Sequence, residues 1–221
     1  MSLNIVIDVE MCRVPKICRW SGYPYSNEII QLGAVKLNEA YDVIDQFSMY
    51  VSPIYGIIDY FITQLTEIHQ KDVRKAPPLI NVLEQLMRWI GDDVPTFFSW
   101  SDTDYYQIRD EIRAKKMVFE NMEQILKKEN WVDYQQIVSR RFEFDHQIKL
   151  SDALDLTEID VEGRLHDGLA DAFNTAMIIA KIEKNPGIKF ALDRMRENKA
   201  MSVPFGTSLG GLLEGIELVS A

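Results

Sequence analysis

The feature that most constrains the fold is an apolar run near the start of the chain, residues 3–10 (LNIVIDVE). Its apolar side chains occupy both odd and even positions. A strand with one face in water alternates apolar and polar residues, so a run that is apolar on both faces predicts a strand in the middle of a sheet. The rest of the chain must therefore supply neighbouring strands and the helices that cover them.

Later β-rich runs predict those neighbours. Residues 28–37 (EIIQLGAVKL) and 41–51 (YDVIDQFSMYV) are joined by the short polar stretch 38–40, which is typical of an antiparallel hairpin. Residues 94–100 (VPTFFSW) predict a further strand, and residues 131–134 predict a shorter one. The chain is therefore expected to form one mixed sheet of about five strands.

Helical spacing fills much of the remaining sequence. After Pro77 and Pro78, apolar residues recur at helical spacing from Leu79 to Ile90 and stop before Gly91. The segments expected to be helical are residues 62–76, 79–90, 104–116, 135–141, 150–156 and 167–183. Because a hairpin comes first and strands then alternate with helices, the sequence predicts an α/β fold with an antiparallel hairpin, later parallel strands, and flanking helices.

Composition limits the class of protein. Hydrophobic residues make up 47% of the sequence and charged residues 26%, which is the balance of a packed globular protein. No apolar run approaches the roughly 20 residues that cross a bilayer, and residues 1–4 (MSLN) lack the basic flank of a signal peptide. We therefore expect a cytoplasmic protein that does not bind membranes. Cys12 and Cys18 are expected to remain thiols, since a chain with a full core needs no disulfide.

The charge balance argues against one class of nucleic-acid-binding protein. The chain has 24 Lys and Arg against 34 Asp and Glu, a formal net charge of −10, which is the opposite of what a protein that coats a duplex needs. Acidic residues gathered at one metal site would nevertheless attract divalent cations that reverse the sign locally. Net charge therefore limits affinity for nucleic acid without excluding chemistry on it.

The last part of the chain differs in composition from the rest. Residues 185–187 (NPG) break the last expected helix, and residues 201–221 contain Pro204 and several glycines, which argue against a long helix. We therefore expect one domain at residues 1–185. Residues 186–221 are expected to form a helical or glycine-rich appendage that packs on this domain or extends from it.

Two acidic residues close the first apolar run. Asp8 and Glu10 are two positions apart on a predicted strand, so their carboxylates point to the same face and repel each other. In a central strand this arrangement is unfavourable unless a cation or several hydrogen-bond donors compensate. The pair taken alone is also explained by a strand whose end has reached solvent.

A second acidic cluster, Asp102 and Asp104, follows the strand predicted at residues 94–100. Ends of neighbouring strands bring distant residues together at one edge of a sheet. The cluster has a simpler explanation too, because Asp102 or Thr103 would cap the following helix and an acid in the first turn favours the helix dipole.

A third pattern lies at residues 163–172 (GRLHDGLADA), where His166 stands at the beginning of a predicted helix and Asp171 in its first turn. Asp167 is the expected cap of this helix. Asp171 could serve only the helix dipole, and a histidine before a helix is often a structural hydrogen-bonding group. Each of the three patterns has a structural explanation when it is considered separately.

Together the three patterns resemble the DEDDh group of 3′–5′ exonucleases in the ribonuclease H-like superfamily. That group carries D-x-E on its first central strand, an aspartate after S-W on a later strand, and H-x-x-x-x-D at a late helix. The resemblance runs from about residue 3 to residue 182 and includes EIIQLGAVKL (28–37), TQLT (63–66) with a following Ala76-Pro77, and GRLHDGLADAFNTAMI (163–178). The S-W-x-x-x-D and G-R-x-H-x-G-x-x-D forms are similar to the branch of the ERI-type RNA exonucleases and the bacterial sporulation inhibitor KapD.

The resemblance implies a ribonuclease H-like fold and a two-metal site. It assigns four ligands to two Mg²⁺ ions, which Mn²⁺ is expected to replace: Asp8, Glu10, Asp104 and Asp171. Asp8 is expected to bridge the two ions, and His166 to act as the general base. The second pattern offers both Asp102 and Asp104, and Asp104 is preferred because its spacing from Trp100 fits the motif better.

The implied reaction is stepwise hydrolysis of single-stranded RNA or DNA from the 3′ end, with release of 5′-monophosphates. Met11, Leu65 and Thr66 occupy the positions that match the family's contacts to the terminal nucleotides, although Leu65 would serve equally in a core. Glu67 stands where many relatives carry glycine, which could alter the substrate groove. No motif separates RNA from DNA.

Two other functions stay open at this point. A KapD-like regulatory protein would use the same fold to bind a protein while retaining the acidic residues. A proofreading subunit of a polymerase would use residues 186–221 to bind its protein partner. Degradation of end-labelled oligonucleotides by the wild type and by an Asp8→Ala variant would separate these functions from an independent nuclease.

Overall fold

A computed structural model describes residues 3–19 and 22–186 of the 221-residue chain. The appendage expected at residues 186–221 lies outside the described residues except for Pro186. The division of the chain at residue 185 therefore stays a prediction.

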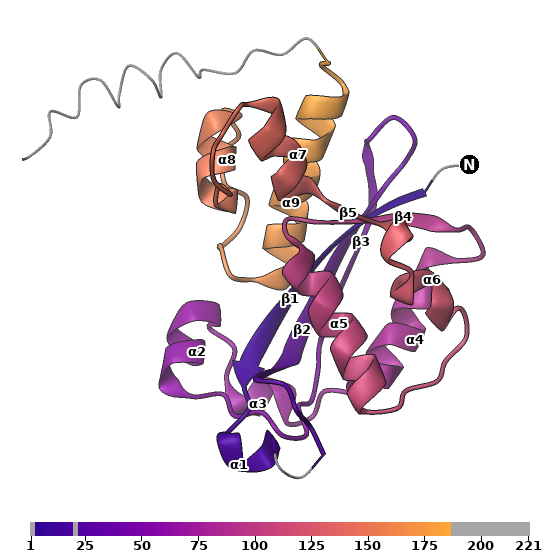
Figure 1. The fold of residues 1–221 in the computed structure, drawn as a ribbon, viewed down its shortest axis with the longest axis vertical. Helices are drawn as coiled ribbons and strands as arrows, with labels where there is room; N and C mark the ends of the chain where they lie inside the picture. The colour runs from indigo at the N-terminus through magenta and orange to yellow at the C-terminus, as the bar shows by residue number, and fades with distance from the viewer. Residues whose placement is uncertain (1–2, 20–21, 187–221) are drawn as a thin grey trace, which may run out of the picture. The chain divides into compact units, whose positions relative to one another are not determined.

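Five strands form one sheet in the order β3-β2-β1-β4-β5 (Figure 1). The strands are β1 (Leu3–Arg13), β2 (Asn27–Leu37), β3 (Val43–Tyr50), β4 (Pro95–Ser99) and β5 (Trp131–Asp133). β1, β2 and β3 pair in antiparallel fashion, whereas β4 is parallel to both β1 and β5. The expected mixed α/β sheet, a hairpin followed by parallel strands, is confirmed.

β1 is the middle strand of the sheet, with β2 on one side and β4 on the other. Its residues 5–7 are fully buried, as the apolar run predicts. The strand continues beyond its expected end at Glu10, because β2 keeps pairing with it as far as Arg13. The register shifts between Glu10 and Met11, so the ladder is irregular next to the acidic residues.

Helices occupy most of the other described residues. They are α1 (Lys16–Arg19), α2 (Tyr60–Thr66), α3 (Gln70–Val73), α4 (Leu79–Ile90), α5 (Asp102–Ala114), α6 (Met122–Leu126), α7 (Tyr134–Arg141), α8 (Leu150–Leu156) and α9 (Gly168–Glu183). A short 3₁₀ turn lies at Lys128–Asn130. α4 and α8 have the expected bounds, and α5, α7 and α9 differ from them by one or two residues.

The short helical patterning expected at residues 62–76 corresponds to two separate short helices, α2 and α3. α2 ends at Thr66, where Glu67 adopts a φ of 55°, and this left-handed conformation terminates a helix. α1, α6 and the 3₁₀ turn were not expected. Each spans five residues or fewer, which is too short for apolar periodicity to indicate a helix.

The helices divide between the two faces of the sheet. Ile5, Ile7 and Val9 of β1 share one core cluster with buried residues of α4 and α5. α9 contacts β1, β2 and β3 with buried residues that lie outside this cluster, and Figure 1 shows α4 and α9 on different sides of the strands. Because successive residues of a strand face opposite sides, Asp8 and Glu10 belong to the face that α9 covers.

Two further expectations concern membranes and cysteines. Among the described residues, no helix has both the length and the apolar character needed to cross a membrane. Cys12 and Cys18 form no disulfide within the described part of the chain.

Candidate functional site

The five residues expected to carry the chemistry come together in one groove of about 550 Å³. They are Asp8 and Glu10 of β1, Asp104 of α5, His166, and Asp171 of α9. Glu10, Asp104 and Asp171 are buried, whereas His166 is exposed. We call this hollow the carboxylate groove. It combines buried acids with an imidazole that solvent can reach.

The start of α5 places Asp104 in the carboxylate groove. Ser101 caps this helix, and its hydroxyl accepts the N–H of Thr103 at 3.3 Å, so the expectation that Asp102 or Thr103 is the cap is wrong. Asp104 is only 6% exposed, and its Oδ1 accepts the N–H of Val9 at 3.1 Å. This hydrogen bond fastens α5 to the central strand between the two acidic residues of β1.

Asp102, the other candidate in this pattern, lies elsewhere. It forms an ion pair with Lys128 at the 3₁₀ turn, and it is not among the residues that line the carboxylate groove. The structure therefore brings Asp104, and not Asp102, to Asp8 and Glu10.

The start of α9 places Asp171 in the groove. Asp167 caps the helix as expected, since its Oδ1 accepts the N–H groups of Leu169 and Ala170, each at 3.1 Å. Gln31 of β2 holds the same turn, because its amide donates to Asp167 Oδ2 and accepts the N–H of Gly168, both at 3.1 Å. α9 therefore begins at a fixed point above β2.

A glycine in β2 permits this close approach. A Cβ on Gly33 would lie 2.2 Å from the carbonyl carbon and oxygen of Gly168, which is closer than non-bonded atoms approach in folded proteins. The glycine within the run EIIQLGAVKL thus serves a tertiary contact, which brings the helix that carries Asp171 onto the sheet.

His166 lies beside two of the carboxylates. Its backbone N–H donates to Asp171 Oδ2 at 2.8 Å, and its φ is 64°. One ring nitrogen of His166 and one carboxylate oxygen each of Glu10 and Asp171 lie within 4.8 Å of one another. The short loop before α9 therefore presents the imidazole to the acidic residues.

Arg164 connects this loop to α2. Its guanidinium donates to the carbonyl oxygen of Leu65 at 2.9 Å and also to that of Thr66. A weaker ion pair joins it to the exposed carboxylate of Glu67 at 3.5 Å. The loop of His166 and the end of α2 are thereby held together.

The carboxylates raise one another's pKa values. Burial, followed by the charges of Asp171 and Asp104, raises the pKa of Glu10 to about 8. Burial and then the charge of Asp104 raise the pKa of Asp8 well above its usual value. Burial is also the main cause that raises the pKa of Asp104 and that of Asp171. Such a cluster is unfavourable near neutral pH unless a cation balances it.

The donor set of the groove fits a divalent cation. Hard cations such as Mg²⁺ take oxygen ligands, and carboxylates supply them. Asp171 Oδ1 is buried, and no described residue forms a hydrogen bond with it. A cation in the groove would satisfy this oxygen and offset the repulsion among the four acids. The residues present therefore form a candidate metal site.

The three expected substrate contacts lie in two environments. Met11 and Leu65 line the carboxylate groove. Thr66 is 1% exposed, and its hydroxyl donates to the Ile62 carbonyl at 2.9 Å and accepts the N–H of Ile68 at 3.1 Å. The side chain of Thr66 thus stabilises the end of α2, while the two apolar side chains face the groove.

The groove also contains residues that the sequence did not indicate. Gln135 at the start of α7 and Lys149 before α8 line its far side, and Arg13 and Asn27 line the end near β1 and β2. Gln135 donates to the Ile148 carbonyl at 2.7 Å, so it also fixes the segment before α8. No local pattern marks these residues, because the pairing of β1 with β2 places Arg13 and Asn27 there, and the tertiary packing of the segments around α7 and α8 places Gln135 and Lys149.

Comparison with known proteins identifies the family. A family model described as "Exonuclease" matches residues 5–179. The chain belongs to this exonuclease family. The matched residues include all five residues of the candidate site, and the expected resemblance to the DEDDh exonucleases is confirmed.

Curated relatives of this chain include ERI1 exoribonuclease 2. The protein from Mus musculus is 32% identical over 207 residues, with 80% of this chain and 28% of the relative covered. The protein from Homo sapiens is 31% identical with the same coverage. The chain thus spans 28% of the length of these two relatives. A 75-residue stretch is 39% identical to DNA polymerase III PolC-type from Clostridium perfringens and covers 34% of this chain and 5% of that one.

Solved structures share the fold of this chain. The nuclease domain of 3′hExo, a DEDDh family member bound to rAMP, has a TM-score of 0.70 at 22% identity, with 86% of this chain and 96% of that chain covered. Exonuclease I from E. coli in complex with a dA16 oligonucleotide has a TM-score of 0.59 at 13% identity, with coverages of 83% and 41%. The expected ribonuclease H-like fold is therefore confirmed.

Proposed function

We propose that this exonuclease hydrolyses single-stranded RNA or DNA from the 3′ end and releases 5′-mononucleotides one at a time. The observation that supports this most strongly is the carboxylate groove, which four acids from three separate elements line together with an exposed imidazole. The fold adds support, because solved relatives hold rAMP or a dA16 oligonucleotide.

We further propose that Asp8, Glu10, Asp104 and Asp171 hold two Mg²⁺ ions, for which Mn²⁺ can substitute. When bound, such ions lower the pKa of the attacking water, neutralise the phosphate, and stabilise the leaving oxygen. Two observations support a cation-binding site here. Asp171 Oδ1 is buried without a hydrogen-bond partner among the described residues, and the pKa of Glu10 is raised by burial and also by the neighbouring acids.

His166 would take the proton of the attacking water. A general base must come within hydrogen-bond reach of that proton, and its ring must be accessible to the water. The ring is exposed, and its nitrogen lies near oxygens of Glu10 and Asp171. The hydrogen bond from the backbone N–H of His166 to Asp171 fixes the loop while leaving the imidazole available for proton transfer.

Asp104 would act from a fixed position. Because its Oδ1 already accepts the N–H of Val9, the carboxylate is oriented before substrate binds, and less ordering is needed when phosphate arrives. Asp171 is held in the same way by the N–H of His166. The chain thus orients two acids through backbone hydrogen bonds from neighbouring segments.

The apolar side of the groove would hold the terminal nucleotide. Met11 and Leu65 present side chains there, and apolar contacts to a base need no particular base identity. Thr66 would support this contact by keeping the end of α2 in place. Hydrolysis without sequence preference is therefore expected.

The decisive experiment follows degradation of RNA and DNA oligonucleotides that carry a label at the 5′ end, with Mg²⁺ or Mn²⁺. We expect a ladder of products that shorten from the 3′ end, and its loss both in chelator and in Asp8→Ala. A correctly folded wild type that leaves both substrates intact with both metals would contradict the proposal. That result would favour a regulatory protein that uses the fold for binding.

A further inference from the structure

A second hollow, of about 460 Å³, is lined by three basic residues. Arg13 lies at the end of β1, and Lys16 and Arg19 belong to α1. All three side chains are exposed. We call this the basic hollow. Its volume is in the range of ordinary ligand sites, about 300–1,000 Å³.

The basic hollow adjoins the carboxylate groove. Arg13 and Asn27 line both of them, so the two hollows share a wall. Along β1, Arg13 follows Glu10 by three positions, a distance of about 10 Å on an extended strand. A polymer whose end lies at the carboxylates can therefore continue over Arg13 toward α1, which Figure 1 shows near the end of β1.

The three cations of the basic hollow form no close ion pair within the described part of the chain. Within residues 3–19 and 22–186, none of the ion pairs involves Arg13, Lys16 or Arg19. Asp59, which caps α2 by accepting the N–H of Ile62 at 2.9 Å, also lines the hollow, so its lining carries three positive charges and one negative charge. Arg19 also donates to the Val14 carbonyl at 3.3 Å, a neutral partner that leaves its charge in place. The chain as a whole has a formal net charge of −10, so a hollow whose lining is mainly basic stands out from the rest of the sequence. Such a lining favours an anionic ligand.

Aromatic surface lies next to these cations. The guanidinium of Arg13 is 5.0 Å from the ring centroid of Phe61, and Phe61 is 53% exposed at the start of α2. The neighbouring Tyr60 is 80% exposed. A cation beside an exposed ring suits a ligand that carries both phosphates and flat bases, because bases stack on such rings while the cation attracts the phosphates.

We propose that the basic hollow binds the backbone phosphates of the nucleotides upstream of the 3′ end, with Phe61 stacking against one of the bases. This inference rests on the proposed function and adds the path by which the strand leaves the active site. Lys16 and Arg19 are then contacts for longer substrates, and they do not touch the reacting phosphate.

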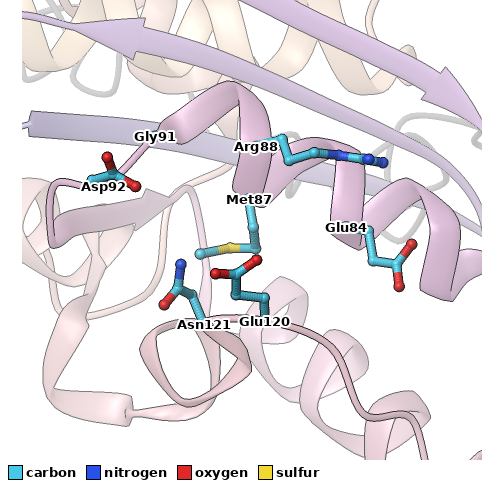
Figure 2. Close-up of a pocket in the computed structure, with 7 residues that line it drawn as sticks. All are labelled: Glu84, Met87, Arg88, Gly91, Asp92, Glu120 and Asn121. Atoms are coloured by element: carbon cyan, nitrogen blue, oxygen red, sulfur yellow. The ribbon is translucent and has the colours of Figure 1, made fainter.

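Another hollow of the molecule has the wrong charge for this role. Figure 2 shows a hollow between α4 and the segment before α6, where Arg88 is accompanied by Glu84, Asp92 and Glu120. None of its lining residues lines the carboxylate groove. It therefore supplies a matched control, because a cation removed there leaves the proposed path unchanged.

The test compares Lys16→Gln/Arg19→Gln with Arg88→Gln/Lys127→Gln in the full chain. Arg88 lines the hollow of Figure 2, and Lys127, just after α6, is an exposed residue that lines neither the basic hollow nor the carboxylate groove. Each double variant therefore removes two exposed cations, and both change the net charge equally. Binding of a fluorescent oligonucleotide of about twelve nucleotides is measured by anisotropy at several salt concentrations, with Ca²⁺ replacing Mg²⁺ to prevent turnover.

For Lys16→Gln/Arg19→Gln we expect Kd to rise about tenfold. The slope of log K against log salt should shrink by about 1.4, which is about 0.7 for each phosphate that the variant no longer neutralises.

A dinucleotide separates this inference from the proposed function. It reaches only the carboxylate groove, so Lys16→Gln/Arg19→Gln should hydrolyse it at the wild-type rate with Mn²⁺. Oligonucleotide binding by this variant with the Kd and salt slope of the control would overturn the inference while leaving the nuclease intact. A wild type that binds the oligonucleotide yet cleaves neither substrate would contradict the proposed function, and the binding comparison would still decide the role of the basic hollow.

Discussion

At the scale of single residues, the site depends on backbone groups that fix the acidic side chains. Val9 donates to Asp104, and His166 donates to Asp171. Val9 lies between Asp8 and Glu10 on β1, and His166 is itself a residue of the site. The backbone of β1 therefore orients Asp104, and the backbone of the loop before α9 orients Asp171, which limits the movement of both carboxylates.

The two aspartates of the α5 first turn provide a matched pair. Asp104→Asn should reduce kcat to near background, because it removes a charge from the carboxylate groove. Asp102→Asn should keep kcat within about twofold of wild type, since it removes only a surface ion pair with Lys128, worth about 0–1 kcal/mol. Initial rates on a labelled oligonucleotide check both variants. Equal losses in the two would show that the assignment of Asp104 is incorrect.

His166 is expected to serve proton transfer and not metal affinity. His166→Ala should lower kcat by about 10²–10⁴-fold, the range typical of a missing general base. Its Mn²⁺ affinity, measured by calorimetry, should stay close to wild type. Asp171→Ala is the companion variant and should lose metal binding. Loss of Mn²⁺ binding in His166→Ala would instead make the imidazole a metal ligand.

At the scale of elements, the contact between β2 and α9 positions the helix that carries Asp171. Gly33 packs against the first turn of α9, and Gln31 holds that turn through two hydrogen bonds. A side chain at position 33 would push α9, and with it Asp171, away from β1. The catalytic geometry thus depends on a residue that has no chemistry of its own.

Gly33→Ala should therefore affect both stability and activity. We expect the free energy of unfolding to fall by about 1–3 kcal/mol, as for other overpacked sites, together with a lower kcat. Ser48→Ala is the control, because Ser48 pairs with Gly33 across the ladder and is exposed on β3. Chemical denaturation and oligonucleotide assays give the two readouts. A Gly33→Ala protein as stable and active as the control would refute this role of Gly33.

At the scale of the whole molecule, the buried acids link stability to pH. The pKa of Glu10 is raised from 4.5 to about 8 in the folded protein. The folded state therefore binds more protons than the unfolded state between these two values, and stability falls as pH rises through this window. A cation that binds the charged groove opposes this loss.

Wild type and Glu10→Gln, compared in chelator, test this linkage. Wild type should lose thermal stability relative to Glu10→Gln as pH rises from about 5 to about 8. Mg²⁺ should then raise the wild-type melting temperature more at about pH 8 than at about pH 5. Calorimetric scans measure both effects. A difference between the two proteins that does not change with pH would contradict the raised pKa of Glu10.

The fold could be predicted from local patterns where those patterns are long. The apolar run at residues 3–10 identified the central strand, and the spacing of Leu79 to Ile90 gave α4 its observed bounds. The patterns failed where elements are short or where a single residue changes the backbone. Glu67 divides residues 62–76 into two helices through its left-handed conformation, which a pattern of apolar residues does not reveal.

The sequence by itself determined which kinds of residue could form a site and on which strand the site begins, because strand alternation places Asp8 and Glu10 on one face regardless of the rest of the fold. The family resemblance favoured Asp104 over Asp102, but only the tertiary structure places Asp104 beside Asp8 and Glu10 and gathers Arg13, Lys16 and Arg19 around a neighbouring hollow. The reason is physical. Alternation and capping act over a few residues, whereas Asp104 reaches β1 through a hydrogen bond between residues far apart in the chain, and Arg13 lies beside Asn27 through the pairing of β1 with β2.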